Sequence, residues 1–178
     1  MREWLQISGT IGKPSVEHPK RPICGLDLAK VEVSGSRFWG LMESLCGDPS
    51  HFFTNCYVHN YCPLCFMATS GKNITPPMLK VGERGPLQDI CDRFLMEVIG
   101  LLEVDWVVGV GKYAEARSQI ALKKSGVCLG GGKEVRVCHV THPSPINPAA
   151  NKDWTGLAIS QLTDLGVLEI VKGTAEHT

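Results

Sequence analysis

Residues 106–140, WVVGVGKYAEARSQIALKKSGVCLGGGKEVRVCHV, contain the pattern that decides the fold. Residues 106–110 are a short continuous apolar run, which is typical of a β-strand covered on both faces. Residues 112–124 are predicted to form a helix, because the lysines that close it suit the negative end of a helix dipole. A glycine-rich turn at residues 126–132 leads to a second predicted strand at residues 135–140. A strand, a helix and a strand in this order predict a right-handed crossover and parallel pairing.

Upstream of this unit, local signals predict a helix, a strand and a loop. Residues 34–47 are predicted to be a helix, with Ser34 as its N-cap and Gly47 closing its C-terminus. Residues 52–58 are aromatic and β-branched, so they are predicted to form a strand. Residues 68–86 are rich in Gly, Pro, Thr, Lys and Asn, which is typical of a long surface loop.

Two further helices are predicted on either side of the strand–helix–strand unit. Pro86 fits the first turn of a helix that ends near residue 102. Its predicted buried side consists of Leu87, Ile90, Cys91, Phe94, Val98 and Leu101. Residues 151–165 predict a last helix, followed by Gly166. The inward residues of this last helix are predicted to be Trp154, Leu157, Ala158 and Leu162.

Strands that alternate with helices predict an α/β fold, here a three-layer α/β/α sandwich with a short parallel sheet. Three strands make a thin sheet, and the first helix has no strand before it to pack against. We therefore expect a first strand to be missing. A length of 178 residues suits one domain. We expect residues 1–178 to be a single domain that is incomplete at its N-terminus.

Composition narrows the function classes. A hydrophobic content of 43% supports a packed core, and a formal net charge of zero gives no whole-chain signal for a nucleic-acid partner. No signal peptide and no apolar run of about 20 residues is found, so we expect no membrane association. The eight cysteines leave a disulfide framework open, but without a signal peptide we favour a reduced intracellular protein.

Polar residues follow each predicted strand, where ligands bind in open parallel sheets. Asn60 follows the first, the Gly109-x-Gly111 turn the second, and His142 and Ser144 the third. We expect these ends to converge on one rim of the sheet. Each residue has a plainer interpretation: Asn60 as a turn residue, and Gly109 and Gly111 as a tight strand-to-helix turn.

Several other residues have structural explanations that weigh against a site. His59 and His139 lie in or beside predicted strands, so we interpret them as structural. The pair Cys62 and Cys65 has metal-like spacing, but no second pair follows at zinc spacing, so we predict no metal. The basic segment at residues 18–22 could contact phosphate, but we interpret it as a solvated loop.

Residues 140–145, VTHPSP, resemble the second active-site motif of uracil-DNA glycosylases. Residues 147–154, NPAANKDW, and residues 58–64, VHNYCPL, are similar to the single-strand-selective monofunctional branch of that family. With shorter supporting stretches, the resemblance covers residues 2–168 and is specific as an ordered set.

The resemblance implies a base-flipping hydrolase without metal or cofactor, which reads the flipped base in a tight pocket. Asn60 would pair with N3–H and O4 of uracil. His142 would be catalytic and stabilise negative charge on the uracil O2. Ser144 would hold a phosphate, and the loop after it would wedge into DNA. The implied DNA-binding residues are Ser144, Pro145, Ile146, Asn147, Pro148, Ala149, Ala150, Asn151 and Lys152.

The resemblance further implies a monomeric, nuclear enzyme of base-excision repair. It would release uracil and related oxidised pyrimidines from single- and double-stranded DNA, with no membrane partner. Two departures matter. No segment matches the Gly- and Pro-rich motif whose Asn positions water and whose aromatic residue stacks on uracil, although residues 2–5 resemble the family segment directly after that motif. Ile146 stands where the branch often carries a basic residue.

We therefore expect this chain to be impaired in hydrolysis, and two other functions stay open. The first is a non-catalytic, truncated DNA-binding isoform that keeps the recognition and wedge segments. The second is a small nucleotide- or metal-binding α/β domain, which would rest on Gly109, Gly111, Cys62 and Cys65.

Overall fold

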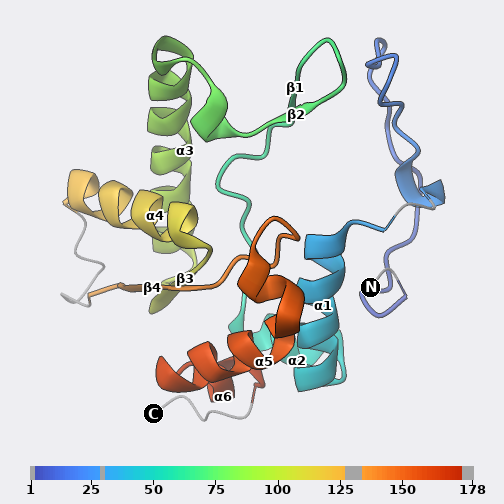
Figure 1. Cartoon of the computed structure of the whole chain (residues 1–178). Helices are drawn as coiled ribbons and strands as arrows, with labels where there is room; N and C mark the ends of the chain where they lie inside the picture. Colours follow the sequence, from blue (N-terminus) through green and yellow to red (C-terminus); the bar gives the residue numbers. More distant parts are fainter. Residues whose placement is uncertain (1–2, 29–30, 127–133, 174–178) are drawn as a thin grey trace.

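A short parallel sheet lies at the centre of the fold. The structure is a computed structural model, and it describes residues 3–28, 31–126 and 134–173 (Figure 1). β3 (Trp106–Val110) pairs in parallel with β4 (Arg136–Val140), with Val108 opposite Cys138 in the register. The predicted strand–helix–strand unit is confirmed.

The connecting helix also agrees with the prediction. α4 (Lys112–Ser125) begins after Gly111 and ends at Gly126, whose left-handed φ of 61° suits a glycine. The rest of the predicted glycine-rich turn, residues 127–132, lies outside the described residues.

Helices cover both faces of the sheet, because alternate residues of a strand point in opposite directions. Val107 packs against a cluster from α3 (Val81–Leu101) and α4. Trp106 and Val108 pack against a larger cluster that includes α1 (Val33–Cys46) and α5 (Pro148–Asp164). Figure 1 shows α3 and α4 on one side, and on the other α1 and α5 together with α2 (Pro49–Asn55) and α6 (Leu168–Val171). The predicted three-layer α/β/α class is confirmed.

α1 matches its predicted range but has a different N-cap. The side chain of Glu32, not of Ser34, accepts hydrogen bonds from the first amides of the helix. Gly47 closes the helix with a φ of 68°, as predicted. The side chains of Leu41 and Met42 are buried in the larger cluster.

The strand predicted at residues 52–58 is wrong, because its first half belongs to α2 (Pro49–Asn55). The carboxylate of Asp48 accepts the N–H of Ser50 at 2.8 Å, and Pro49 occupies the first turn, so a strong start signal favours the helix. Helical geometry also buries Phe52, whose ring lies 6.0 Å from that of Trp39. Within the described residues, the parallel sheet therefore has two strands instead of three.

The predicted loop at residues 68–86 contains regular structure. β1 (Phe66–Met67) and β2 (Asn73–Ile74) form a small antiparallel hairpin, and the 3-10 turn η2 (Pro76–Met78) follows. The basic segment near the N-terminus binds this hairpin, because Nε of Arg21 donates to the carbonyl of Gly71 at 2.8 Å. A second short turn, η1, spans Gly25–Asp27.

α3 begins five residues before the predicted start, and its buried side is rotated. Pro86 lies inside the helix, where the missing N–H costs one backbone hydrogen bond. Of the residues predicted to be buried, Ile90, Phe94 and Leu101 are exposed. The buried residues of α3 are Cys91, Asp92, Leu95 and Ile99. Because this buried side contains the carboxylate of Asp92, the spacing of apolar residues alone predicted the wrong side of α3.

The last helix begins at the end of the candidate loop. α5 (Pro148–Asp164) starts three residues before the prediction, because the side chain of Asn147 accepts the N–H of Ala149 at 3.1 Å. Its predicted inward residues Trp154, Ala158 and Leu162 are buried, and Leu157 is half-buried. Asp153 has non-helical angles, φ −159° and ψ 85°, so the helix is broken there. α6 (Leu168–Val171) follows. None of the helices that the structure describes is both long and apolar enough for a bilayer crossing.

Gly109 allows α4 to lie close to β3. A Cβ atom built on Gly109 would lie 2.5 Å from the backbone nitrogen of Glu115. We expect Gly109→Ala to lower the free energy of unfolding by about 1–3 kcal/mol, because an overpacked core must shift. Urea denaturation followed by circular dichroism measures this. The control is Gly100→Ala in α3, where nothing lies within 4 Å and where alanine favours the helix. Equal stability of the Gly109→Ala variant and the unchanged chain would contradict the packing argument.

Candidate functional site

The carboxyl ends of β3 and β4 meet at one rim of the sheet. The backbone N–H of Gly111, directly after β3, donates to the carbonyl of Val140 at 2.8 Å. Gly111 has a φ of +96°, and a Cβ there would lie 3.0 Å from the Cβ of His142. His142 is therefore packed against the β3–α4 turn. Close packing accounts for both Gly109 and Gly111, which agrees with the tight-turn interpretation.

The hydrogen bonds of His142 determine its tautomer. Its side chain is exposed, and Nδ1 lies 3.0 Å from the backbone nitrogen of Ser144. A backbone N–H can only donate, so Nδ1 accepts, and the proton of the neutral imidazole must sit on Nε2. His142 thus offers one N–H donor to a ligand at the rim of the sheet.

A carboxylate lies in the electrostatic surroundings of His142. Burial alone would raise the pKa of Glu32, but the backbone amides of Gly35 and Ser34 and the nearby His142 together lower it. Glu32 is therefore ionised at neutral pH, where it both caps α1 and contributes negative potential near the His142 ring.

The first residues of the loop after β4 are anchored by hydrogen bonds and burial. The carbonyl of Thr141 accepts Nε1–H of Trp154 at 2.7 Å, and the N–H of Thr141 donates to Oε1 of Gln161 at 2.8 Å. Pro143 is fully buried. These contacts fix the start of the loop against α5, so His142 stands on rigid backbone.

The nine predicted DNA-binding residues divide into Ser144, three residues that shape the loop and five exposed residues. Ser144 Oγ accepts the N–H of Ile146 at 3.3 Å, which leaves its own hydroxyl proton free to donate. Asn147 caps α5, Ala150 is buried, and the Asn151 amide is used inside the loop, so these three shape the loop. The exposed residues without a side-chain hydrogen bond in the described structure are Pro145, Ile146, Pro148, Ala149 and Lys152. Ile146 is 90% exposed.

Asn60 does not follow a paired strand, which corrects the prediction that three strand ends converge. It follows an extended segment after α2, and its side chain is exposed. Within the described residues, no hydrogen bond joins Asn60 to His142 or to the loop after it. Among the residues that the structure describes, the Asn60 amide has no hydrogen-bond partner, so it is available to a ligand.

The residue after Asn60 is anchored in a buried polar network that the sequence did not reveal. Tyr61 donates its hydroxyl proton to Oδ1 of Asp92 at 2.7 Å and accepts from Nε of Arg117 at 3.1 Å. Arg117 also forms an ion pair with Asp92. Burial and the bond to Asp92 raise the pKa of Tyr61 well above its usual value, so it stays protonated. This network ties the Asn60 segment to α3 and α4.

His59 packs against α3, although the strand predicted beside it is absent, and its burial is unfavourable. Its ring lies 5.5 Å from that of Phe94, and its Nε2 is buried without a hydrogen-bond partner in the described structure. Burial lowers the pKa of His59, because it penalises the charged imidazolium. The folded chain therefore holds this histidine neutral.

Acid should destabilise the chain through His59. In the unfolded chain its pKa is about 6.5, so below that pH the unfolded state gains a proton that the folded state does not. We expect stability to fall as pH drops below about 6.5 and to level off once pH passes the lowered folded pKa. His59→Phe should reduce this loss, measured as urea midpoints at pH 5 and pH 8. Identical pH dependence in the two proteins would contradict this role.

The other predicted candidates do not gather into a site. Sγ of Cys65 lies 3.9 Å from Oδ1 of Asn73, whereas Cys62 interacts with Cys91 on α3. His139 of β4 pairs with Glu115 at 2.8 Å. In the part of the chain that the structure describes, no group of three His, Cys, Asp or Glu side chains is arranged to hold a metal ion.

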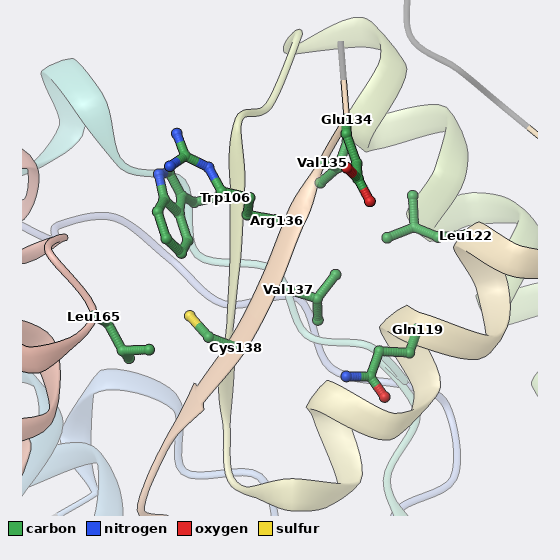
Figure 2. A pocket seen from close by; sticks show the side chains of 9 residues that line it. All are labelled: Trp106, Gln119, Leu122, Glu134, Val135, Arg136, Val137, Cys138 and Leu165. Atoms are coloured by element: carbon green, nitrogen blue, oxygen red, sulfur yellow. The ribbon is translucent and has the colours of Figure 1, made fainter. Parts of the chain in front are cut away.

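A groove runs along β4, from Glu134 before the strand to Cys138 within it. Its volume is about 570 Å³, and it borders the beginning of both strands (Figure 2). The guanidinium of Arg136 lies 4.1 Å from the centre of the Trp106 ring at this end. The lining residues are Trp106, Gln119, Leu122, Glu134, Val135, Arg136, Val137, Cys138 and Leu165. This groove is separate from the rim that carries the candidate residues.

Comparison with known proteins decides the family. No protein-family profile matches the chain. The single-strand selective monofunctional uracil-DNA glycosylase of Rattus norvegicus is 47% identical over 171 residues, which cover 96% of this chain and 59% of the rat protein. The chain is a homologue of this glycosylase over nearly its whole length. The Mus musculus protein is 45% identical over 180 residues, and the Bos taurus protein is 45% identical over 171 residues.

The chain spans less than two thirds of the length of these relatives. It spans 59% of the rat protein, 62% of the mouse protein and 61% of the bovine protein. The resemblance carried by the segments around Asn60 and His142 is therefore confirmed at the level of the family, and the roles of individual residues stay predictions.

Proposed function

We propose that this chain acts on uracil in DNA and that His142 is its charge-stabilising residue. The observation that carries the proposal is the hydrogen bond from the Ser144 N–H to Nδ1 of His142, at 3.0 Å. It leaves Nε2–H as a fixed donor on a loop whose first residues are anchored in the fold. As the N-glycosidic bond breaks, negative charge grows on the uracil O2, and a donor that is already oriented stabilises it without reorganisation.

Ser144 and Ile146 would engage the DNA around the flipped nucleotide. The Ser144 hydroxyl proton would donate to a phosphate oxygen. Ile146, 90% exposed at the tip of the loop, would fill the space left by the base. An apolar side chain suits this task, because unstacking a base pair must be compensated by new contacts. The proposal covers single- and double-stranded DNA, and oxidised pyrimidines besides uracil.

Asn60 would select the base. Its amide offers one acceptor and two donors, which match N3–H and O4 of uracil. Asn60→Asp should weaken uracil selection, because a carboxylate has no donor for O4. We expect a loss of at least tenfold in the preference for uracil over cytosine, whose N3 and N4–H₂ reverse the donor and acceptor pattern, measured by competition binding with oligonucleotides that differ only in that base. An unchanged preference would remove Asn60 from recognition.

We further propose that these 178 residues hydrolyse uracil slowly. Nothing in the sequence matches the motif whose Asn positions the attacking water. The test is release of uracil from single-stranded DNA by the chain, with a binding measurement on abasic DNA beside it. Binding without release, with affinity that falls steeply as salt is added, would favour a non-catalytic DNA-binding function. Robust turnover would refute the proposed impairment.

The remaining properties complete the proposal. We propose a single-domain monomer in the nucleus that takes part in base-excision repair and needs neither cofactor nor metal. Light scattering measures whether the chain is a monomer, and imaging of a tagged chain measures whether it is in the nucleus. If no metal is needed, full activity is expected after treatment with a chelator.

A further inference from the structure

Arg37 joins two distant parts of the chain at the base of the candidate loop. It lies on α1, and its Nη1 donates to the carbonyl of Pro143 at 2.9 Å. Its Nη2 donates to Oδ1 of Asn151 at 3.0 Å. The Asn151 Nδ2 in turn donates to the carbonyl of Pro145 at 2.6 Å. One guanidinium therefore closes the loop from both sides.

The planar shape of the guanidinium makes this closure specific. Its two donors have fixed directions, so both acceptors are satisfied only when the two ends of the loop lie at one separation. Further hydrogen bonds continue inside the loop, where the N–H of Asn147 donates to the carbonyl of Ser144 at 3.0 Å. The exposed Ile146 projects from this closed ring. Ordering a loop before it binds avoids an entropic cost on binding.

We propose that Arg37 is a positioning residue for the DNA-contacting loop. Its guanidinium holds residues 143–151 in the shape that presents Ile146 and His142, so that the loop meets DNA already ordered. The binding part of this inference rests on the proposed function, whereas the effect on loop order does not.

A direct phosphate contact is the competing role for an arginine near DNA. The two roles predict different changes in the salt dependence of DNA affinity when Arg37 is replaced. Removing a phosphate contact reduces the slope of log affinity against log salt by about 0.9. Removing a positioning residue lowers affinity but leaves the slope unchanged, because the number of neutralised phosphates stays the same.

The variants are Arg37→Ala, Arg37→Lys and Asn151→Ala, each made in the 178-residue chain. Arg37→Lys keeps the charge and the aliphatic stem, but an ammonium cannot reproduce the planar two-donor fork. Arg93→Ala is the matched control, because it removes one exposed positive charge from α3 and does not touch the loop. Circular dichroism verifies that each variant is folded.

Two measurements are made on every variant. Hydrogen exchange of the Ser144, Ile146 and Asn147 amides in the free protein reports loop order and needs no DNA. Affinity for an abasic duplex at several salt concentrations reports binding. For Arg37→Ala we expect exchange at least tenfold faster, affinity about tenfold weaker and an unchanged salt slope. Arg37→Lys should behave similarly, and adding Asn151→Ala to Arg37→Ala should cause little further loss.

The outcomes separate the two proposals. Unchanged exchange in both Arg37 variants would overturn the positioning role, whatever the DNA data show. Wild-type affinity in Arg37→Lys, or a salt slope reduced by about one in Arg37→Ala, would overturn it in favour of a phosphate contact. Faster exchange in a chain that binds no DNA would uphold the effect of Arg37 on loop order and reject the proposed function.

Discussion

Replacing His142 by alanine is expected to lower the rate of uracil release by a factor of about 10²–10³, the usual cost of losing one oriented donor to a developing oxyanion. The expectation rests on the single donor that the proposed role assigns to this side chain. Nδ1 is occupied by the Ser144 N–H, so the only proton of the neutral ring faces outward on Nε2. Alanine removes this donor and leaves the backbone of the loop attached through Thr141 and Pro143.

The measurement is best made where the basal rate is high. The 178 residues can be joined to the part of the rat relative that they do not match, and single-turnover release of uracil compared with and without His142→Ala. His51→Ala is the matched control, because His51 is an exposed histidine of α2. We expect the control to retain its rate. A loss of less than about tenfold in the His142 variant would exclude it as the main charge-stabilising residue.

Replacing Asp92 by alanine is expected to lower the free energy of unfolding by about 3–5 kcal/mol, because it leaves a buried guanidinium without its acceptor. Asp92 is 5% exposed. It pairs with Arg117 and accepts from Tyr61 at 2.7 Å, so one substitution removes the centre of the network. Urea denaturation measures the loss.

Two controls separate a buried charge from a simple ion pair. Asp89→Ala breaks the pair that Asp89 and Lys124 form at 3.1 Å, but both side chains are more than half exposed, so we expect at most about 1 kcal/mol. The double variant Asp92→Leu, Arg117→Met removes both buried charges, and we expect it to be more stable than Asp92→Ala alone. A loss below about 1 kcal/mol for Asp92→Ala would contradict the assigned burial cost.

The same network gives a dependence on acid. Burial would raise the pKa of Asp92, but the hydrogen bonds from Arg117 and Tyr61 and the charge of Arg117 lower it. A carboxyl whose folded pKa is lowered contributes stability above its unfolded pKa of about 3.9 and loses it as pH falls toward the folded value. Acid unfolding should therefore steepen below about pH 4, a change that Asp92→Ala removes.

The β3–α4–β4 unit could be predicted because the residues that determine it lie within the unit itself. The continuous apolar run of β3, Gly111 at the turn and the closing lysines of α4 need no distant partner to be read. α2 was mispredicted because Phe52 and Phe53 are residue types that favour a strand. Asp48 and Pro49 instead start a helix, and packing of Phe52 against Trp39 stabilises it.

Distant partners explain what the sequence could not show. The buried side of α3 depends on Arg117, which lies 25 residues from Asp92 in the chain. Arg37 reaches Pro143 across 106 residues. A single arginine on a helix carries no local sign of such a partner. The segments around Asn60 and His142 were found because ordered motifs, and not periodicity, carry them.

The break in α5 has a consequence for how this family can vary. Asp153 leaves the helical path, and its carboxylate accepts the N–H of Gly156 at 2.9 Å, which starts the helix afresh. The inward positions of Trp154 and Ala158 are set from this second start. The exposed residues of the loop can therefore be exchanged at constant length without rotating the core residues further along α5. Because Arg37 holds both ends of the loop, its length stays fixed, and under the proposed function such exchanges are a route to an altered grip on DNA.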